Sequence, residues 1–151
     1  MNGVQDPGLD AGLQPGRTDR TRGLRRLAGT GLVATLLAVA ATTLAAALAR
    51  ALGVDFEIHD GGETIPLSGV AAVTGAFSLV GVVIAAALLR VSARPAESFM
   101  GTAVSLTVVS MVPPFLSGGS TGTIVALVVL HLVAATVMIP GLVRGLRPRN
   151  V

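Results

Sequence analysis

Near its carboxyl end the chain reads TIVALVVLHLVAATVMIPGLV over residues 123–143, with no Asp, Glu, Lys or Arg among them. Three further apolar stretches of similar length cover residues 27–49, 68–89 and 98–116. A helix of about 20 residues crosses a hydrocarbon layer about 30 Å thick. None of the stretches carries the polar stripe of a soluble helix or the alternation of a β-barrel strand. The sequence therefore predicts an all-α membrane protein in which four transmembrane helices form a bundle.

Composition supports lipid as the solvent for most of this chain. Hydrophobic residues make up 52% of its 151 residues, charged residues 13%, and the mean hydropathy is +0.77. That leaves too little polar surface to cover a water-soluble globule of this size. The chain has no cysteine, which excludes disulfides, thiolate catalysis and cysteine metal sites. We expect no cofactor, because no motif for one is present.

The distribution of arginine predicts the orientation. Ten of the arginines precede the first stretch, lie between the second and third, or follow the fourth: Arg17, Arg20, Arg22, Arg25, Arg26, Arg90, Arg94, Arg144, Arg147 and Arg149. Only Arg50 falls on the other side. Because positive residues beside membrane spans stay in the cytoplasm, we expect both termini there, in a bacterial plasma membrane. The pI near 11.3 does not indicate nucleic-acid binding, because the arginines flank spans and attraction to lipid headgroups explains them.

These features divide the chain into three parts. Residues 1–26 are expected to be a disordered basic cytoplasmic tail, with a docking segment for lipid or a partner as the alternative. Residues 27–147 form the transmembrane domain, and 148–151 a short cytoplasmic tail. The run ending in Ala47-Leu48-Ala49 imitates a secretory signal with its cleavage site. It is longer than the roughly 7 to 15 apolar residues of such a signal, so we expect it to remain as a span.

The longest connection, between the first two spans, has the pattern of a small hairpin. Residues 54–59 alternate apolar and polar, Asp60-Gly61-Gly62 is a turn signal, and residues 64–67 could return as a second strand. We expect a short extracytoplasmic β-hairpin-like loop with Val54, Phe56 and Ile58 facing the bundle. An isolated hairpin is only marginally stable in water, so the bundle has to support it.

The same loop holds a cluster of acidic residues and one histidine: Asp55, Glu57, His59, Asp60 and Glu63. Carboxylate oxygens and an imidazole can together bind a divalent cation. The spacing matches neither a calcium loop nor a zinc helix motif. We therefore expect a solvated acidic surface, with a cation site as the alternative.

His131 is the one ionisable residue inside the four stretches, and such residues are costly in a membrane. It lies about 8 residues, or roughly 12 Å, below the outer end of its span. Six hydroxyl residues on the other spans fall near that depth: Thr42, Thr43, Thr74, Ser78, Thr107 and Ser110. Pro113 and Pro114 should leave the carbonyls of Val109 and Ser110 without helical partners. A neutral His131 could bind such a carbonyl or hydroxyl and lock the third span to the fourth, or it could relay protons or bind a ligand.

Small residues recur at helical spacing on the first two spans. The sets are Ala34, Ala38, Thr42 and Ala46 on the first, and Ala71 with Gly75 and Gly81 with Ala85 on the second. Such ridges let helix backbones approach closely. They could serve packing inside the bundle or a homodimer, and the sequence leaves both open.

Several short motifs resemble a known family. They are Ile65-Pro66, Arg94-Pro95 followed by Phe99, the Pro113-Pro114 break, and the run from His131 to Ala135 that leads to Ile139-Pro140. Over residues 27–147 the chain resembles a family of uncharacterised four-span integral membrane proteins from actinobacteria, a domain of unknown function. The resemblance implies the topology and an importance for His131, and it implies no activity, substrate or cofactor.

Three classes of function remain open from the sequence. A non-enzymatic membrane component that scaffolds or binds a partner is the preferred interpretation, with the lipid bilayer, a second copy or another membrane protein as partners. A small transporter or channel subunit could use the polar layer around His131, although no Asp, Glu, Lys or Arg lies within a span. A membrane enzyme with His131 or His59 as general base is least favoured, because no carboxylate lies at depth to orient the ring.

Overall fold

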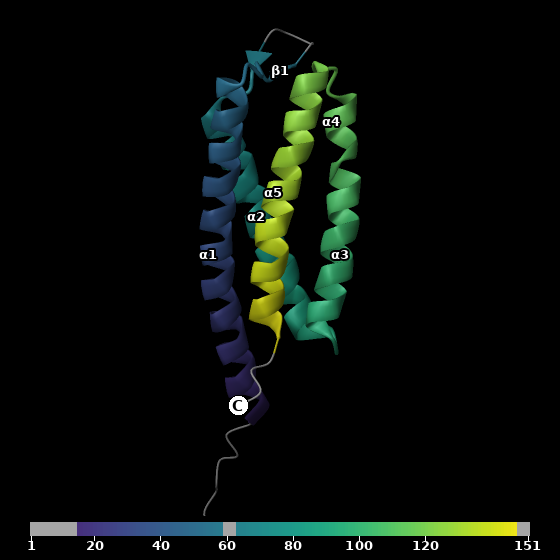
Figure 1. The fold of residues 1–151 in the computed structure, drawn as a ribbon. Helices are drawn as coiled ribbons and strands as arrows, with labels where there is room; N and C mark the ends of the chain where they lie inside the picture. Colours follow the sequence, from purple (N-terminus) through teal and green to yellow (C-terminus); the bar gives the residue numbers. More distant parts are fainter. Residues whose placement is uncertain (1–14, 59–62, 148–151) are drawn as a thin grey trace, which may run out of the picture.

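The computed structural model of the chain describes the backbone of residues 15–58 and 63–147, and side chains at 20–56 and 64–147. Its helices are α1 (Pro15–Ala51), α2 (Leu67–Val91), α3 (Pro95–Ser110), α4 (Val112–Leu116) and α5 (Thr121–Leu146) (Figure 1). Two short strands, β1 (Glu57–Ile58) and β2 (Glu63–Thr64), lie between α1 and α2. Within the described residues, four helical segments are long and apolar enough to cross a membrane: Arg20–Ala51, Leu67–Val91, Pro95–Leu116 and Thr121–Leu146.

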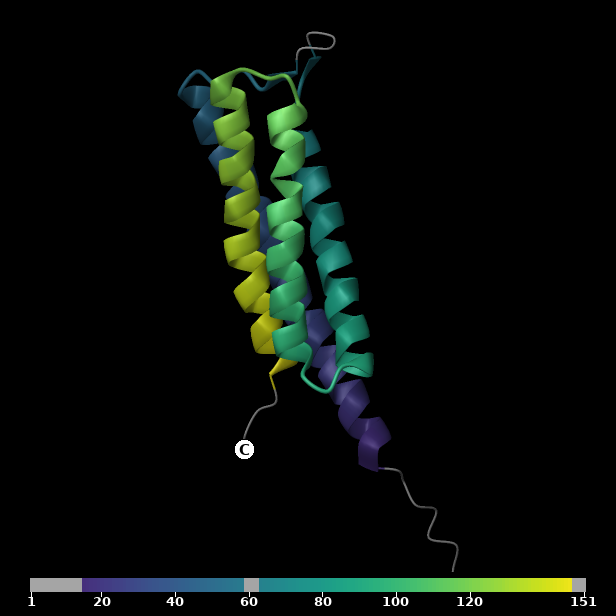
Figure 2. The same ribbon diagram turned by 90° about the vertical axis from the view of Figure 1, so that its right-hand side faces the viewer.

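The four long helices run up and down in turn and form a closed ring of neighbours. α1 packs against α2 and α5, and α3 joins α2 to α5 on the opposite side (Figures 1 and 2). The start of α1 and the end of α5 lie at one end of the bundle, here called the terminal end. The connection that carries β1 and β2 lies at the other end, here called the loop end. α1 makes far more contacts with its two neighbours than α3 does, so α1 is the central element of the packing.

The ridge of small residues on α1 explains why that helix is central. Ala34, Ala38, Thr42 and Ala46 are between 0% and 4% exposed, and Gly31 lies against Val82 of α2. Short side chains let the helix axes approach, and close approach brings many more atoms into van der Waals contact. Of the two uses that the sequence left open, the structure shows that this ridge serves packing inside the bundle.

Many large apolar side chains lie on the outside of the bundle. Leu44 on α1, Phe77 on α2 and Leu116 on α4 are 70%, 73% and 78% exposed. In water such a surface would be unstable, and an exposed apolar face on every helix is typical of a bundle whose solvent is lipid.

The expected disordered tail is too long by at least 12 residues, because α1 begins at Pro15 and not near residue 27. A proline suits the first helical position, where its missing N–H needs no partner. Nucleation is the unfavourable step of helix formation, and the apolar stretch that follows already forms a helix. Residues 15–26 therefore only extend an existing helix. Packing also contributes, since Gly23 lies against Leu89 of α2. Residues 1–14 and 148–151 of the predicted tails lie outside the described residues.

The third span is interrupted where Pro113 and Pro114 predict a break. α3 ends at Ser110, Met111 lies between the helices, and α4 runs over Val112–Leu116. The N–H of Met111 donates to the carbonyl of Val108 at 3.2 Å, a tighter turn than an α-helix makes. Proline lacks the N–H that an uninterrupted helix needs, which accounts for the break.

A glycine ends α1 at the loop end. Gly53 has φ +89°, its N–H donates to the carbonyl of Arg50 at 2.9 Å, and the N–H of Val54 donates to the carbonyl of Ala49 at 3.0 Å. These are the two bonds of a Schellman motif, in which only glycine adopts the left-handed conformation without strain. The chain then turns sharply back over the bundle.

The segment beyond this turn contains a two-residue pairing. β1 and β2 are antiparallel, with Glu57 opposite Thr64 and Ile58 opposite Glu63. The sequence predicted longer strands, and residues 59–62 of the expected turn lie outside the described residues. Phe56 is 1% exposed and packs in a cluster with Ala46, Ala126 and Leu130. Its φ of 50° is unusual for a residue other than glycine, and burial of the ring offsets that strain.

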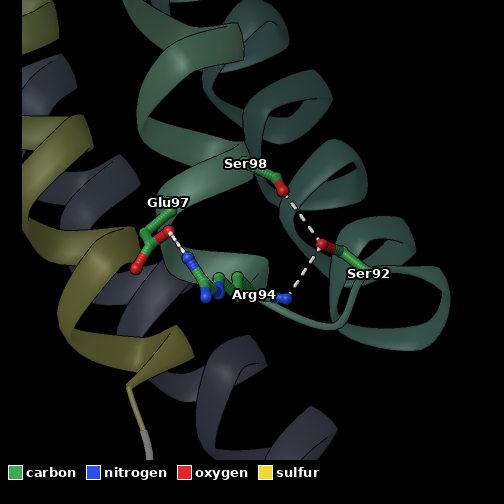
Figure 3. Close-up of polar contacts among 4 residues, drawn as sticks. All are labelled: Ser92, Arg94, Glu97 and Ser98. Carbon is green, nitrogen blue, oxygen red and sulfur yellow. Dashed lines mark hydrogen bonds and ion pairs between the residues drawn. The ribbon is translucent and has the colours of Figure 1, made fainter.

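The turn between α2 and α3 is held by polar contacts at the terminal end (Figure 3). The hydroxyls of Ser92 and Ser98 are 2.9 Å apart, and the N–H of Arg94 donates to Ser92 Oγ at 3.2 Å. Nη1 of Arg94 lies 3.4 Å from Oε2 of Glu97, and both side chains are exposed. Glu97 lies in the first turn of α3, where its negative charge also interacts favourably with the positive end of the helix dipole. These contacts together hold the connection between α2 and α3.

Candidate functional site

The polar layer predicted around His131 is only partly assembled. Among the described residues, one hydrogen bond of this layer runs between helices, and it joins Thr42 Oγ1 on α1 to Thr74 Oγ1 on α2 at 3.2 Å. Thr42 Oγ1 also donates to the carbonyl of Ala38 at 2.9 Å. Ser78 is buried one turn further along α2. Thr42 and Thr74 therefore form a local contact between α1 and α2.

His131 is bonded within its own helix. Nδ1 lies 2.8 Å from the carbonyl oxygen of Leu127, and the ring is half-buried. A carbonyl can only accept, so Nδ1 carries the proton, and in the neutral ring Nε2 is left as an acceptor. Nδ1 therefore does not make the expected bond to a freed carbonyl of Val109 or Ser110 on α3. A backbone carbonyl four residues earlier is always within reach of a helical side chain, whereas a partner on α3 needs the right register.

The two members of the layer on α3 are also bonded locally. Thr107 Oγ1 donates to the carbonyl of Ala103 at 2.8 Å, and Ser110 Oγ donates to the carbonyl of Thr107 at 2.8 Å. Thr43 Oγ1 on α1 is buried and, within the described part of the chain, has no hydrogen-bond partner. The structure thus brings Thr42 and Thr74 together and leaves His131, Thr107 and Ser110 each bonded to its own helix. Whether His131 has a functional role stays a prediction.

The acidic loop is described only in part. Asp55 is exposed, and Glu57 and Glu63 lie in β1 and β2. His59 and Asp60 lie outside the described residues. The expected solvated surface and its alternative, a cation site, both stay predictions.

Arg50, the single arginine near the loop end, binds the connection over the bundle. Its Nη2 donates to the carbonyl of Ile65, and its guanidinium carbon lies 5.8 Å from the centre of the Phe56 ring. The N–H of Ile65 in turn donates to the carbonyl of Phe56 at 3.2 Å. Sequence reasoning noted Arg50 only as an exception to the charge pattern. The isolation of Arg50 between two apolar stretches was itself a signal, because a charge beside apolar segments is stabilised by a polar partner.

Arg26 has a corresponding role at the terminal end, which sequence reasoning also missed. Nη1 donates to the carbonyl of Arg147 and Nη2 to the carbonyl of Arg144, both at 3.2 Å. Carbonyls in the last turn of a helix have no partners inside it, and a guanidinium placed there also suits the negative end of the helix dipole. Arg26 therefore ties α1 to the end of α5.

A pair of glycines sets the distance between α1 and α5. A Cβ on Gly141 would lie 2.8 Å from the Cβ of Ala34, and a Cβ on Gly145 would lie 2.5 Å from Oγ1 of Thr30. Both gaps are shorter than any carbon–carbon or carbon–oxygen contact allows. The spacing from 141 to 145 is the small-residue pattern of membrane helix pairs, and it could have been recognised on the fourth span as it was on the first two.

Two open grooves lie along the seam between α1 and α5. The one nearer the terminal end, here called the terminal groove, is lined by Gly29, Thr30, Val33, Ala34, Leu37, Val137, Pro140, Gly141 and Arg144. The other, the loop groove, is lined by Ala45, Leu48, Ala49, Leu52, Val54, Thr121, Gly122, Val125, Ala126, Val129 and Leu130. The terminal groove includes an arginine, whereas the loop groove has only hydroxyls and backbone as polar groups.

Comparison with known proteins adds a family to this description. The model of the family described as "Family of unknown function (DUF6069)" matches residues 22–148, which covers the four long apolar helices except the first residues of α1. No curated protein and no solved structure matches the chain.

Proposed function

The chain belongs to the DUF6069 family of unknown function, and from that premise we propose that it is a non-enzymatic component of the bacterial plasma membrane that binds a protein partner. Both termini lie in the cytoplasm in this proposal, and the short loop with β1 and β2 lies outside. The partner is recruited by the first helical turns of α1, which continue beyond the membrane-spanning part of the bundle.

Charge supports the proposed orientation. At the terminal end the described side chains include eight arginines: Arg20, Arg22, Arg25, Arg26, Arg90, Arg94, Arg144 and Arg147. The loop end has Arg50, which is bound to the connection there. Excess arginine next to membrane spans is retained on the cytoplasmic side.

The observation that carries the partner role is the extension of α1. This helix has 37 residues, about 56 Å, whereas α5 has 26, about 39 Å. Figure 2 shows its first turns projecting past the terminal end of the bundle. Arg20 and Arg22 on this projection are exposed, as is Arg25 at its base. A rigid helix bearing three exposed guanidinium groups presents them at fixed spacing, which suits carboxylates on an acidic protein surface.

A transporter or channel subunit built on His131 has less support. The proton on its ring is already bonded to Leu127, and Thr107 and Ser110 are bonded within α3. A pathway for a solute needs polar groups that converge from several helices. The buried contact of Thr42 with Thr74 joins only two.

Quantitative affinity purification in mild detergent tests the partner role. The test variant carries Arg20→Gln, Arg22→Gln and Arg25→Gln. The control carries Arg90→Gln, Arg94→Gln and Arg147→Gln, which removes the same charge at the same end. We expect the test variant to lose a protein that wild type and control both retain, in a manner sensitive to salt. Equal retention by both variants, or equal loss from both, would overturn the proposal.

The absence of cysteine makes the orientation testable without background. Single-cysteine variants Asp55→Cys and Arg22→Cys are exposed to a maleimide that cannot cross membranes, in intact cells. We expect labelling at residue 55 alone, and labelling at both sites once the membrane is permeabilised. Labelling at residue 22 in intact cells would reverse the orientation.

A further inference from the structure

The terminal groove is shaped by the close approach of α1 and α5. Gly141 lies directly against Ala34, so the floor of the groove is made of very short side chains. Val33 and Leu37 form one wall, and Val137 and Pro140 the other. Val33 and Leu37 are each 57% exposed. The result is a narrow apolar channel that opens to the outside of the bundle along several helical turns.

Gly29 leaves the end of this channel open. No atom lies within 4 Å of the position that its Cβ would occupy. At that end the lining changes from apolar to charged, because Arg144 is part of the groove and is exposed. Arg25 lies one helical turn before Gly29, on the same face of α1, and is also exposed.

Little acidic charge accompanies the positive charge at this opening. Asp19, whose side chain lies outside the described residues, is the one Asp or Glu in α1, and α5 contains none. Arg26, fixed on the carbonyls of Arg144 and Arg147, adds a third guanidinium and holds the two helices together there. The described carboxylate at this end, Glu97, is engaged with Arg94. An anion is therefore the group that fits the opening.

We propose that the terminal groove binds one anionic phospholipid of the cytoplasmic leaflet. One acyl chain lies between the wall formed by Val33 and Leu37 and the wall formed by Val137 and Pro140. The phosphate lies at Arg144 and Arg25, since guanidinium groups bind phosphate through paired hydrogen bonds. This site shares Arg25 with the proposed partner surface but adds Arg144 and the apolar groove, and its assignment to the cytoplasmic leaflet rests on the proposed orientation.

A lipid fits this groove better than a helix does. A helix from another protein, or from a second copy, would have to cover Arg144 at the end of the groove and leave its charge unpaired. In a symmetric pair of copies Arg25 and Arg144 would also face their own equivalents. A phospholipid supplies the apolar chain and the anion in one molecule. In a membrane its phosphate already lies at the surface and its acyl chain in the hydrocarbon layer, as the arginines and the apolar walls of the groove require.

Tryptophan fluorescence can measure the lipid preference, because the chain has no tryptophan of its own. Leu37→Trp places a reporter in the groove, and Phe77→Trp places the control on the exposed face of α2. Each variant is reconstituted into symmetric phosphatidylcholine vesicles containing brominated phosphatidylglycerol or brominated phosphatidylcholine, which quench on contact. We expect the brominated phosphatidylglycerol to bind at residue 37 about fivefold more tightly for each arginine engaged, and to show little preference at residue 77. Arg144→Gln should remove about fivefold of the preference at residue 37, whereas Arg90→Gln should not change it.

A second measurement does not depend on a tryptophan in the groove. Gly29→Leu closes the opening, and Gly101→Leu makes the same change on α3, where a Cβ also meets nothing within 4 Å. Native mass spectrometry of protein from phosphatidylglycerol-containing membranes should show one retained lipid on wild type and on Gly101→Leu. Gly29→Leu should lose it.

Three results would overturn the proposal. The first is equal quenching by both brominated lipids at residue 37 together with equal lipid retention by the two leucine variants. The second is loss of lipid from Gly101→Leu as well, which indicates general annular lipid. The third is crosslinking of a Gly29→Cys variant into dimers in membranes, which assigns the groove to a second copy. None of these results depends on the partner of Arg20 and Arg22, so the two proposals can fail separately.

Discussion

Replacement of Gly141 by alanine should push α1 and α5 apart. The new methyl would lie 2.8 Å from the Cβ of Ala34, whereas carbon atoms in contact need about 3.5 to 4 Å. The helices must therefore separate locally by roughly 1 Å. The Cβ of alanine is fixed to the backbone and has no rotamer by which to move aside. The displacement consequently falls on the helices themselves, and it affects the packing of Leu142, which is 0% exposed.

The expected size follows from two opposing effects. Overpacking of this kind costs about 1 to 3 kcal/mol. Replacing a helical glycine by alanine contributes up to about 1 kcal/mol in the other direction. The net change in the free energy of unfolding should be a loss of about 1 to 2 kcal/mol. Gly101→Ala is the matched control, because no atom lies near its Cβ position, and it should be neutral or stabilising by up to about 1 kcal/mol.

Exchange of the two residues provides the decisive comparison. In the double variant Gly141→Ala with Ala34→Gly, one methyl again occupies the contact, so the double variant should be more stable than the sum of the single effects by about 1 to 2 kcal/mol. Unfolding in mixed micelles, followed by far-UV circular dichroism, measures all four proteins and the control. A stability of Gly141→Ala equal to that of Gly101→Ala, or additive effects of Gly141→Ala and Ala34→Gly, would show that the contact between residues 34 and 141 does not set the helix separation.

Three further outcomes are expected from the hydrogen bonds of α1 and α5. Arg26→Gln should lower the free energy of unfolding by about 1 kcal/mol, because the exposed guanidinium bonds to two carbonyls at the end of α5; a denaturation midpoint equal to that of wild type contradicts this. Arg50→Met should speed hydrogen exchange at the amide of Ile65, because it removes the bond from Arg50 Nη2 to the carbonyl of the same residue. Unchanged exchange would show that other contacts hold the connection between α1 and α2. His131→Gln should lower the free energy of unfolding by about 0.6 kcal/mol or less, which is less than the effect of Thr42→Val, because of the two residues only Thr42 bonds to another helix. A lower melting temperature for His131→Gln than for Thr42→Val would show that the ring holds a neighbouring helix.

The spans were predictable because membrane insertion depends on a sum over many residues. The first, second and fourth predicted stretches lie within single helices and the third extends over α3 and α4, and an error of a few residues at either end changes that sum little. The ridge from Ala34 to Ala46 was predictable for a related reason. A repeat at every fourth residue places side chains on one face regardless of what that face meets. Its partner helix, however, was known only from the structure.

The polar contacts were not predictable, because each depends on one position and one register. The bonds from Arg26 to Arg144 and Arg147 cross 118 and 121 residues of sequence. A shift of α5 by one residue would turn those carbonyls by about 100° around the helix. His131 illustrates the opposite case, since sequence reasoning looked for a distant acceptor and the ring uses the carbonyl of Leu127 on its own helix. The prediction that Phe56 faces the bundle is confirmed by its buried ring, whereas its positive φ was not predictable from the loop sequence.

Arg26 and Arg50, two of the arginines on α1, hold this helix at a set depth and rotation relative to the rest of the bundle, although the apolar part between them has no charged residue. Arg26 and Arg50 are 24 residues apart, which is about 36 Å along a helix and slightly more than a hydrocarbon layer of about 30 Å. Each donates to backbone carbonyls of another segment, Arg26 at the end of α5 and Arg50 at Ile65. A backbone carbonyl at a helix end or a turn is polar whatever side chain its residue has. These contacts therefore depend on the geometry of the neighbouring segment and not on its sequence. A lysine retains the charge but concentrates its donors at one atom, whereas the planar guanidinium can reach two carbonyls at once. Arg26→Lys should accordingly leave the orientation unchanged while it loosens the seam between α1 and α5, and with it the opening of the terminal groove.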